Sequence, residues 1–162
     1  SARLVLDAPR DPVHAPVPVM SLVLASLLFV AVGAVAAVHV LWGLGSTWPE
    51  SSAEALARGV VGDGRRRMPP AWQCFAVALA LALVALWPFY MLGRGGDPLV
   101  LAGSFAIGGL FVVRGLAAHS PRWRSRFHDE PFATRDRRYY SPFCLMTGIG
   151  YLALLAGEME RQ

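Results

Sequence analysis

Arg114 is a charged side chain inside an apolar stretch of the sequence, about one turn before the end of residues 98–118. An ionised side chain at the centre of a membrane span costs about 3 kcal/mol and normally faces a partner or the bundle interior. Three interpretations follow. Arg114 reaches the interface with its charged end, or it pairs with Asp136 or with a backbone carbonyl of the loop 119–140, or it binds an anionic ligand.

His39 and Trp42 are three residues apart in another apolar stretch, so they share one face of a helix. His39 could transfer a proton or bind haem iron. A haem held by two histidines needs a second histidine inside another apolar stretch, and the sequence has none there. We therefore favour a structural interpretation, in which His39 hydrogen-bonds a neighbouring helix and Trp42 lies at the membrane interface.

The remaining reactive side chains form no catalytic or metal-binding motif. Cys74 and Cys144 are far apart and lack the spacing of a redox pair or a zinc site. The sequence contains no recognisable pairing of a nucleophile with a base. We predict no catalytic residue, no cofactor and no metal.

Four apolar stretches position these side chains, at about residues 18–44, 71–92, 98–118 and 141–157. A helix needs roughly 20 apolar residues to cross a hydrocarbon core of about 30 Å. Hydrophobic residues make up 55% of the 162 residues, charged residues 16%, and the mean hydropathy is +0.45. The composition predicts an all-α integral membrane bundle of four transmembrane helices.

The segments outside the apolar stretches have their own signals. Residues 1–17 contain three prolines before the first stretch and predict an extended arm, leaving residues 18–162 as the transmembrane domain. Ser51-Ser52-Ala53-Glu54 resembles a capping box that opens a short amphipathic helix ending at Val60. Pro88 is expected to kink or end the second stretch.

All 15 basic residues are arginines, and their distribution predicts an orientation. Ten lie in the two loops 46–70 and 119–140, whereas four lie on the opposite side. Because positive residues in short loops stay in the cytoplasm, we expect both termini outside it. The same distribution favours membrane lipids rather than nucleic acid as partners of a chain with net charge +4.

The connectivity places most unusual polar residues at one membrane face, because two helix ends and two helix starts meet there. The candidates for structural or ligand contact are His39, Trp42, Arg114, Asp136, Arg138, Tyr140 and Ser141.

Two segments resemble a family of small bacterial membrane proteins of unknown function, DUF3995. One is His39-Val-Leu-Trp-Gly-Leu-Gly45 with Trp48, and the other runs from Arg114-Gly115 through Pro131–Cys144. The resemblance implies a four-span architecture in a bacterial cytoplasmic membrane and no established activity. The arm 1–17 and the charged insert Arg65–Arg67 depart from the family pattern.

Two functions remain open. Small residues four apart, such as Gly33 with Ala37, Ser104 with Gly108 and Cys144 with Gly148, allow close helix packing in lipid. This spacing and the lack of catalytic motifs favour a non-catalytic accessory or structural subunit that contacts other integral membrane subunits. The alternative is a small membrane enzyme, or a binder of lipid or anionic ligands, with its site at the cytoplasmic face.

Overall fold

The computed structural model describes residues 17–64, 66–94 and 96–161, so the predicted arm lies outside the described residues except for Val17. The described residues form helices and no strand. In chain order the helices are α1 (Val19–Gly43), α2 (Ala53–Val60), α3 (Ala71–Gly93), α4 (Pro98–Ala117), α5 (Pro121–Arg126), α6 (Phe132–Arg135), the π-helical turn η2 (Asp136–Tyr140) and α7 (Ser141–Met159).

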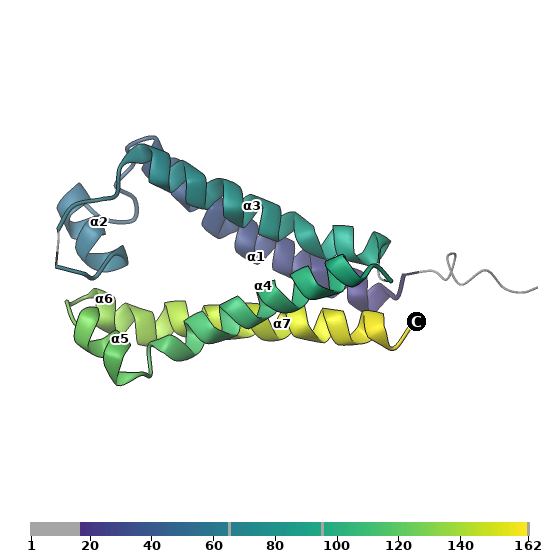
Figure 1. Ribbon diagram of the computed structural model, residues 1–162. Helices are drawn as coiled ribbons and strands as arrows, with labels where there is room; N and C mark the ends of the chain where they lie inside the picture. The colour runs from purple at the N-terminus through teal and green to yellow at the C-terminus, as the bar shows by residue number, and fades with distance from the viewer. Residues whose placement is uncertain (1–16, 65, 95, 162) are drawn as a thin grey trace, which may run out of the picture.

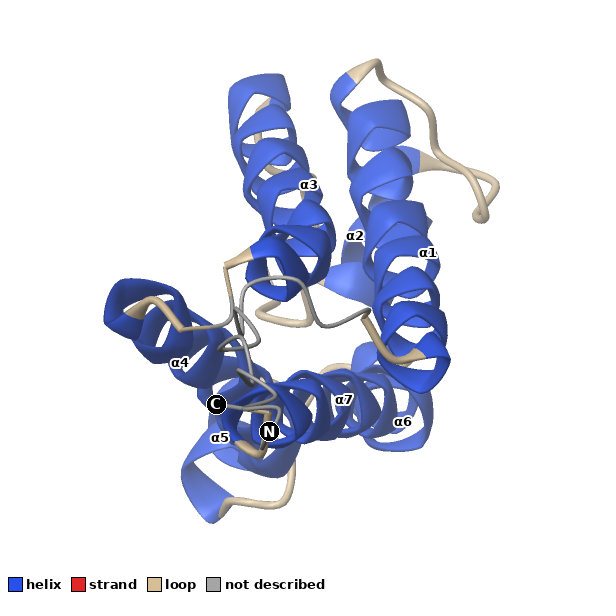
Figure 2. Cartoon of the chain, turned by 90° about the vertical axis from the view of Figure 1, so that its right-hand side faces the viewer, coloured by secondary structure: helices blue, strands red, loops and turns tan. Residues whose placement is uncertain are grey.

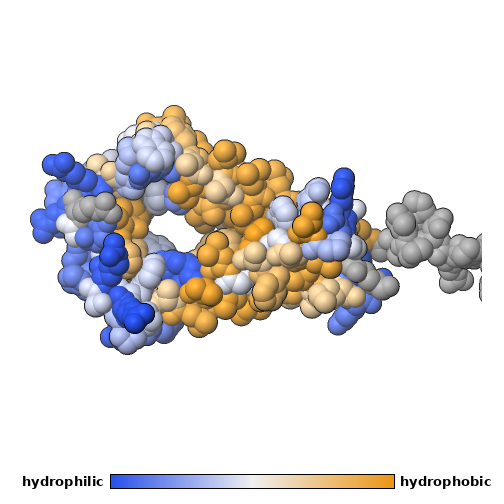
Figure 3. Space-filling view, in the orientation of Figure 1, coloured by the Kyte–Doolittle hydropathy of each residue, from blue (hydrophilic) through white to orange (hydrophobic). Residues whose placement is uncertain are grey.

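Four helical segments are long and apolar enough to cross a membrane, which confirms the predicted all-α transmembrane bundle. They are Val19–Gly43, Ala71–Gly93, Pro98–Ala117 and the continuous segment Phe132–Met159, which joins α6, η2 and α7. Apolar residues cover the long helices, and the polar residues gather at the two ends of the molecule (Figure 3).

Helix boundaries follow local signals in the loops. Ser52 caps α2 by accepting a hydrogen bond from the backbone N–H of Ala55, so a short helix in the first loop is confirmed, although Ser52 alone provides the cap. Asp97 caps α4 in the same way at Leu99. Pro88 does not end α3, which continues to Gly93, so the expectation that the helix could end at Pro88 was wrong. The apolar surroundings of a membrane helix favour keeping the remaining backbone hydrogen bonds.

The long helices form two pairs. α1 packs along α3, and α4 packs along α7. Figure 2 shows the first pair on one side of the molecule and the second pair on the other. The pairs approach each other at the end where α1 begins and α7 ends, and they diverge toward the loops (Figure 1).

The narrow end holds the main hydrophobic core. Its buried residues come from all four long helices, namely Ala25, Leu28, Met91, Val100, Tyr151, Leu154 and Leu155. The Tyr151 hydroxyl donates to the carbonyl oxygen of Val84 at 2.6 Å, which joins α7 to α3. A hydroxyl bonded to backbone inside an apolar core avoids the cost of an unpaired polar group.

Two predicted small residues bring α4 and α7 into close contact. A Cβ atom on Gly148 would lie 2.8 Å from the carbonyl oxygen of Gly108 and 2.8 Å from the backbone nitrogen of Val112. Backbone atoms cannot move aside easily, so this contact requires glycine. Gly33, in contrast, has nothing within 4 Å of its Cβ position, so the described chain does not use that stripe for packing.

We expect Gly148→Ala to lower the free energy of unfolding by about 1–3 kcal/mol, since overpacking forces two helices apart. Gly157 provides the control, because it lies in the same helix and has nothing within 4 Å of its Cβ position. Gly157→Ala should be neutral or mildly stabilising. Thermal unfolding in a mild detergent measures both variants, and equal effects would contradict the packing at Gly148.

Candidate functional site

A cavity of about 670 Å³ lies where the two helix pairs diverge. We call it the central cavity. The space-filling view shows a hollow between the pairs, with polar loop residues on one side and apolar helix residues on the other (Figure 3). The lining residues come from α1, α3, α4, α7 and the loop segments, and they are Val32, Ala34, Val35, Val38, His39, Trp42, Trp48, Pro49, Val60, Leu81, Phe111, Arg114, Arg135, Tyr139, Tyr140, Phe143 and Cys144.

The lining of the central cavity is mostly aliphatic and aromatic, with a few polar side chains near the loops. The polar side chains of the lining include His39, Arg114, Arg135 and Tyr140, which can form hydrogen bonds. A mostly apolar cavity of several hundred Å³ with a few convergent polar groups has the character of a small-molecule site.

Arg114 pairs with Asp136, which confirms the predicted ion pair. Arg114 Nη2 donates to Asp136 Oδ1 at 2.7 Å. The guanidinium also lies over the Trp123 ring, 4.6 Å from its centroid. Its other terminal nitrogen, Nη1, is buried and has no hydrogen-bond partner among the described residues. A buried donor without an acceptor costs about 1–3 kcal/mol, so Arg114 keeps an unused binding capacity.

Asp136 is buried, and both of its carboxylate oxygens accept hydrogen bonds. Besides Arg114, it accepts from Trp123 Nε1 at 2.8 Å and from the Ser141 hydroxyl at 3.3 Å. Only 2% of the Asp136 surface is exposed, so these donors replace the water that would otherwise solvate the carboxylate.

The π-helical turn explains how Asp136 and Ser141 meet. Residues five apart point to different sides of an α-helix, but a π turn, with its i→i+5 repeat, brings them to the same side. η2 begins at Asp136, and Ser141 follows its last residue. The extra residue of this turn therefore lets Ser141 donate to the same carboxylate that accepts from Arg114.

Three contacts, which we call the loop bridge, join the two helix pairs at the wide end. Arg135 Nη1 donates to Glu50 Oε1 at 2.6 Å. The Tyr140 hydroxyl donates to the carbonyl oxygen of Gly59 at 3.0 Å. Phe132 packs against Gly62, which leaves no room for a side chain there. The loop bridge covers the loop side of the central cavity.

The backbone conformation at position 62 also favours glycine. The φ angle of Gly62 is +68°, in the left-handed region that L side chains rarely adopt. The turn after α2 thus places the first loop directly against Phe132.

His39 and Trp42 lie on the wall formed by α1. His39 Nδ1 donates to the carbonyl oxygen of Val35 at 2.9 Å, within its own helix, so the expected bond to a neighbouring helix was wrong. A carbonyl oxygen only accepts, so Nδ1 carries the proton, and Nε2 of the neutral ring is an acceptor. The two rings pack 4.9 Å apart, and Trp42 Nε1 donates to the Trp48 carbonyl at 2.8 Å.

The structure divides the seven candidate residues into three groups. His39, Trp42, Arg114 and Tyr140 line the central cavity. Asp136 and Ser141 lie behind Arg114 and hold it. Arg138 lines no described cavity; its guanidinium is 5.6 Å from the centroid of the Tyr139 ring.

Sequence reasoning missed Trp123, Glu50 and Arg135 as part of this site. Glu50 and Arg135 are 85 residues apart, so no local pattern signals their contact. Trp123 follows a Ser-Pro helix start, but its role depends on where Asp136 lies.

No group of three or more His, Cys, Asp or Glu side chains that could hold a metal ion occurs among residues 17–64, 66–94 and 96–161. Cys74 and Cys144 are both free thiols. Cys144 lines the central cavity, whereas Cys74 is buried in α3.

Comparison with known proteins identifies a family. The model of a family described as a protein of unknown function, DUF3995, matches residues 32–151. This range includes the central cavity, the ion pair and the loop bridge. No curated protein matches the chain, and no solved structure does.

The ion pair predicts non-additive energetics. Breaking a buried pair leaves an uncompensated charge, so Asp136→Ala and Arg114→Ala should each lower the free energy of unfolding by about 3 kcal/mol. The double variant should be little worse than either single variant, because both remove the same interaction. Chemical unfolding in detergent measures the cycle, with the exposed Glu160→Ala as a neutral control. Additive losses would contradict the pairing.

Proposed function

Since the chain belongs to the DUF3995 family, whose description states no activity, we propose its function from the site: the protein binds an amphipathic membrane ligand in the central cavity. The ligand has an apolar chain and a polar, anionic head group. One observation carries the proposal. An apolar cavity at membrane depth is lined by Arg114, whose Nη1 lacks a hydrogen-bond partner among the described residues.

The apolar part of the cavity favours a hydrocarbon chain. Its walls include Val32, Ala34, Leu81 and Phe111, which offer no hydrogen bonds to water through their side chains. Apolar cavities stay dry and bind apolar molecules. A hollow between membrane helices is open to acyl or isoprenoid chains that diffuse sideways in the bilayer.

The polar part favours an acidic head group that also carries a hydroxyl or an acidic proton. A guanidinium donates charge-assisted hydrogen bonds to carboxylate or phosphate oxygens. Arg114 is held by Asp136 and Trp123, so its position is fixed. Nη1 is the donor without a partner among the described residues, and because it is buried in this structure, we expect an anionic oxygen to reach it only when the neighbouring cavity wall moves aside. His39 Nε2, left as an acceptor by the bond from Nδ1, can receive a proton or a hydrogen bond from the same head group.

Oleate is a suitable probe, because it combines one apolar chain with one carboxylate. We expect oleate to raise the unfolding temperature of the purified protein in a neutral detergent, and oleyl alcohol to do so less. Arg114→Gln should weaken oleate binding at least about tenfold, since a hydrogen bond to a charged group contributes about 1.5–3 kcal/mol.

Two tryptophan variants of α1 test the location of the ligand. Ala34 lines the central cavity, whereas Ala37 is exposed on the same helix and does not. Ala34→Trp should fill the cavity and abolish the oleate effect, while Ala37→Trp should retain it. Loss of the effect in both variants, or in neither, would refute binding in the central cavity.

The unused Gly33–Ala37 face supports a second candidate, an accessory subunit that packs against another membrane protein. Gly33 has open space around its Cβ position, and small residues four apart allow close helix contact in lipid. If the protein is an accessory subunit, Ala37→Trp rather than Ala34→Trp should be the disruptive variant. Ala37→Trp should reduce co-purification of a partner after gentle solubilisation, and Ala34→Trp should not.

We further propose a bacterial cytoplasmic membrane location with both termini outside the cytoplasm. The described loops support it by gathering arginines at the end of the molecule that holds α2, α5 and α6 (Figure 1). A reporter enzyme fused after Gln162 should be active only outside the cytoplasm, and one inserted near Gly64 only inside. The opposite pattern would invert the orientation.

A further inference from the structure

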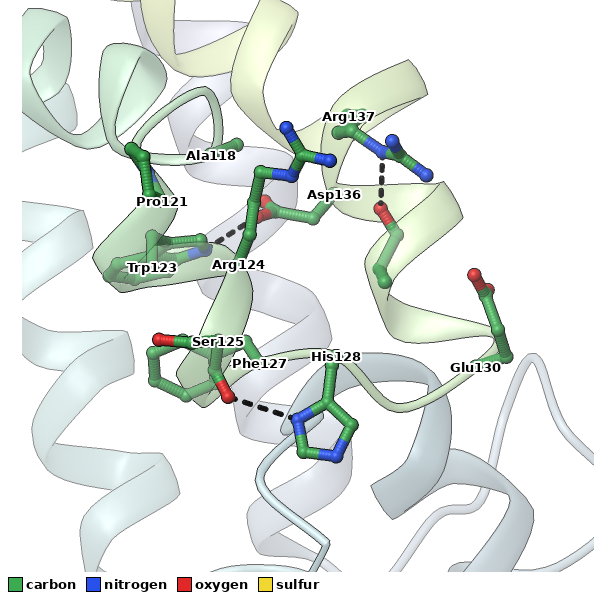
Figure 4. A pocket seen from close by; sticks show the side chains of 11 residues that line it. Ala118, Pro121, Trp123, Arg124, Ser125, Phe127, His128, Glu130, Asp136 and Arg137 are labelled. Atoms are coloured by element: carbon green, nitrogen blue, oxygen red, sulfur yellow. Dashed lines mark hydrogen bonds between the residues drawn. The ribbon is translucent and has the colours of Figure 1, made fainter.

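A second cavity, of about 550 Å³, lies in the polar loop region. We call it the polar pocket. It is formed by α5, α6 and the start of η2, together with the end of α4, and Figure 4 shows its lining side chains. None of its lining residues also lines the central cavity. The polar pocket is therefore a site distinct from the one proposed above.

Two arginines enter the polar pocket from different elements. Arg124 comes from α5 and Arg137 from η2 (Figure 4). Arg124 forms no ion pair among the described residues. Arg137 donates from Nε to the carbonyl oxygen of Ala133 at 3.3 Å, which leaves its two terminal nitrogens for other acceptors.

Neither of the described carboxylates that line the polar pocket forms an ion pair with Arg124 or Arg137. Asp136 is already bonded to Arg114, Trp123 and Ser141. Glu130 accepts hydrogen bonds from the backbone and hydroxyl of Thr134 instead. The ion pairs of the described residues include none between Glu130 and an arginine.

The other side chains of the pocket suit a polar ligand that has an apolar edge. His128 donates from Nδ1 to the Ser125 carbonyl at 3.1 Å, and its Nε2 lies 3.7 Å from Asp129 Oδ1. Trp123 and Phe127 form an aromatic wall, with ring centroids 4.4 Å apart.

We propose that the polar pocket binds a phosphate monoester through Arg124 and Arg137. Each guanidinium can donate two parallel hydrogen bonds to an oxyanion, so two guanidinium groups present four donors. A phosphate monoester offers three terminal oxygens and nearly two negative charges. A carboxylate or a phosphate diester offers only two terminal oxygens and one charge, and it would leave donors unmatched.

The phosphate could belong to a lipid head group or to a soluble molecule. The polar pocket is built around the start of the candidate membrane span 132–159, so we expect it near the depth of the lipid phosphates. The shared chemistry of both sources is a terminal phosphate, and the experiment separates them.

Calorimetric titration of the full-length protein in neutral detergent tests the proposal with three probes. Dioctanoyl phosphatidic acid carries a phosphate monoester on a lipid, dioctanoyl phosphatidylglycerol carries a diester, and glycerol 3-phosphate carries a monoester without chains. We expect saturable binding of phosphatidic acid, with an affinity at least about tenfold higher than that for phosphatidylglycerol.

The key variant is R124Q/R137Q, and its matched control is R126Q/R138Q. Both remove one arginine from α5 and one from η2, but Arg126 and Arg138 do not line the polar pocket. We expect R124Q/R137Q to weaken monoester binding at least about tenfold, and the control to change it less than about threefold. All four positions are exposed, so both variants should fold.

The outcomes are decisive. Comparable binding of glycerol 3-phosphate and phosphatidic acid identifies a soluble phosphate ligand, whereas binding of phosphatidic acid alone identifies a lipid head group. Equal losses in the two double variants, equal affinity for monoester and diester, or no saturable binding would overturn the proposal. Ala34→Trp should retain monoester binding, so failure at the central cavity and failure at the polar pocket are distinguishable.

Discussion

The buried ion pair between Arg114 and Asp136 is the interaction on which the wide end of the molecule depends. A charged side chain near the end of a membrane helix needs a partner, and the chain provides one from the segment that follows α5. That partner must lie deep enough to reach Arg114, so η2 continues directly into α7 and Trp123 covers the pair. The ion pair thus fixes the position of the loop segment against the α4/α7 pair.

The divergence of the helix pairs follows from how each end is filled. At the narrow end, Tyr151, Met91 and their neighbours fill the space between the helices. At the wide end, the contacts between the pairs come from the loops, through Glu50 with Arg135 and Tyr140 with Gly59. The loops connect the two helix pairs across the gap without bringing the long helices into contact there. The space between the helices beneath these loops is the central cavity.

Much of the architecture could be predicted from the sequence, because membrane constraints are local. Four apolar stretches of sufficient length define four helices. The Arg114–Asp136 pair was also predictable, since a membrane arginine demands a partner and Asp136 was a nearby candidate in the sequence. The contact between Gly108 and Gly148 agrees with the spacing of small residues.

The shape of the site could not be predicted, because it depends on contacts between distant segments. Glu50 meets Arg135, and Gly62 meets Phe132, only after the two loops have folded against each other. The loop 119–140 forms α5, α6 and η2, none of which the apolar pattern of the sequence indicates. His39 bonds to its own helix because α1 faces an open cavity at that level rather than another helix.

The most direct test of the central claim is a proton nuclear Overhauser measurement in lipid nanodiscs with labelled alanine methyl groups, in the presence of oleate. Ala34 lines the central cavity, and Ala37 faces outward on the same helix. We predict contacts from the Ala34 methyl group to oleate protons, and contacts from the Ala37 methyl group to bulk lipid. Contacts from Ala34 to water alone, or to other side chains that close the cavity, would contradict it.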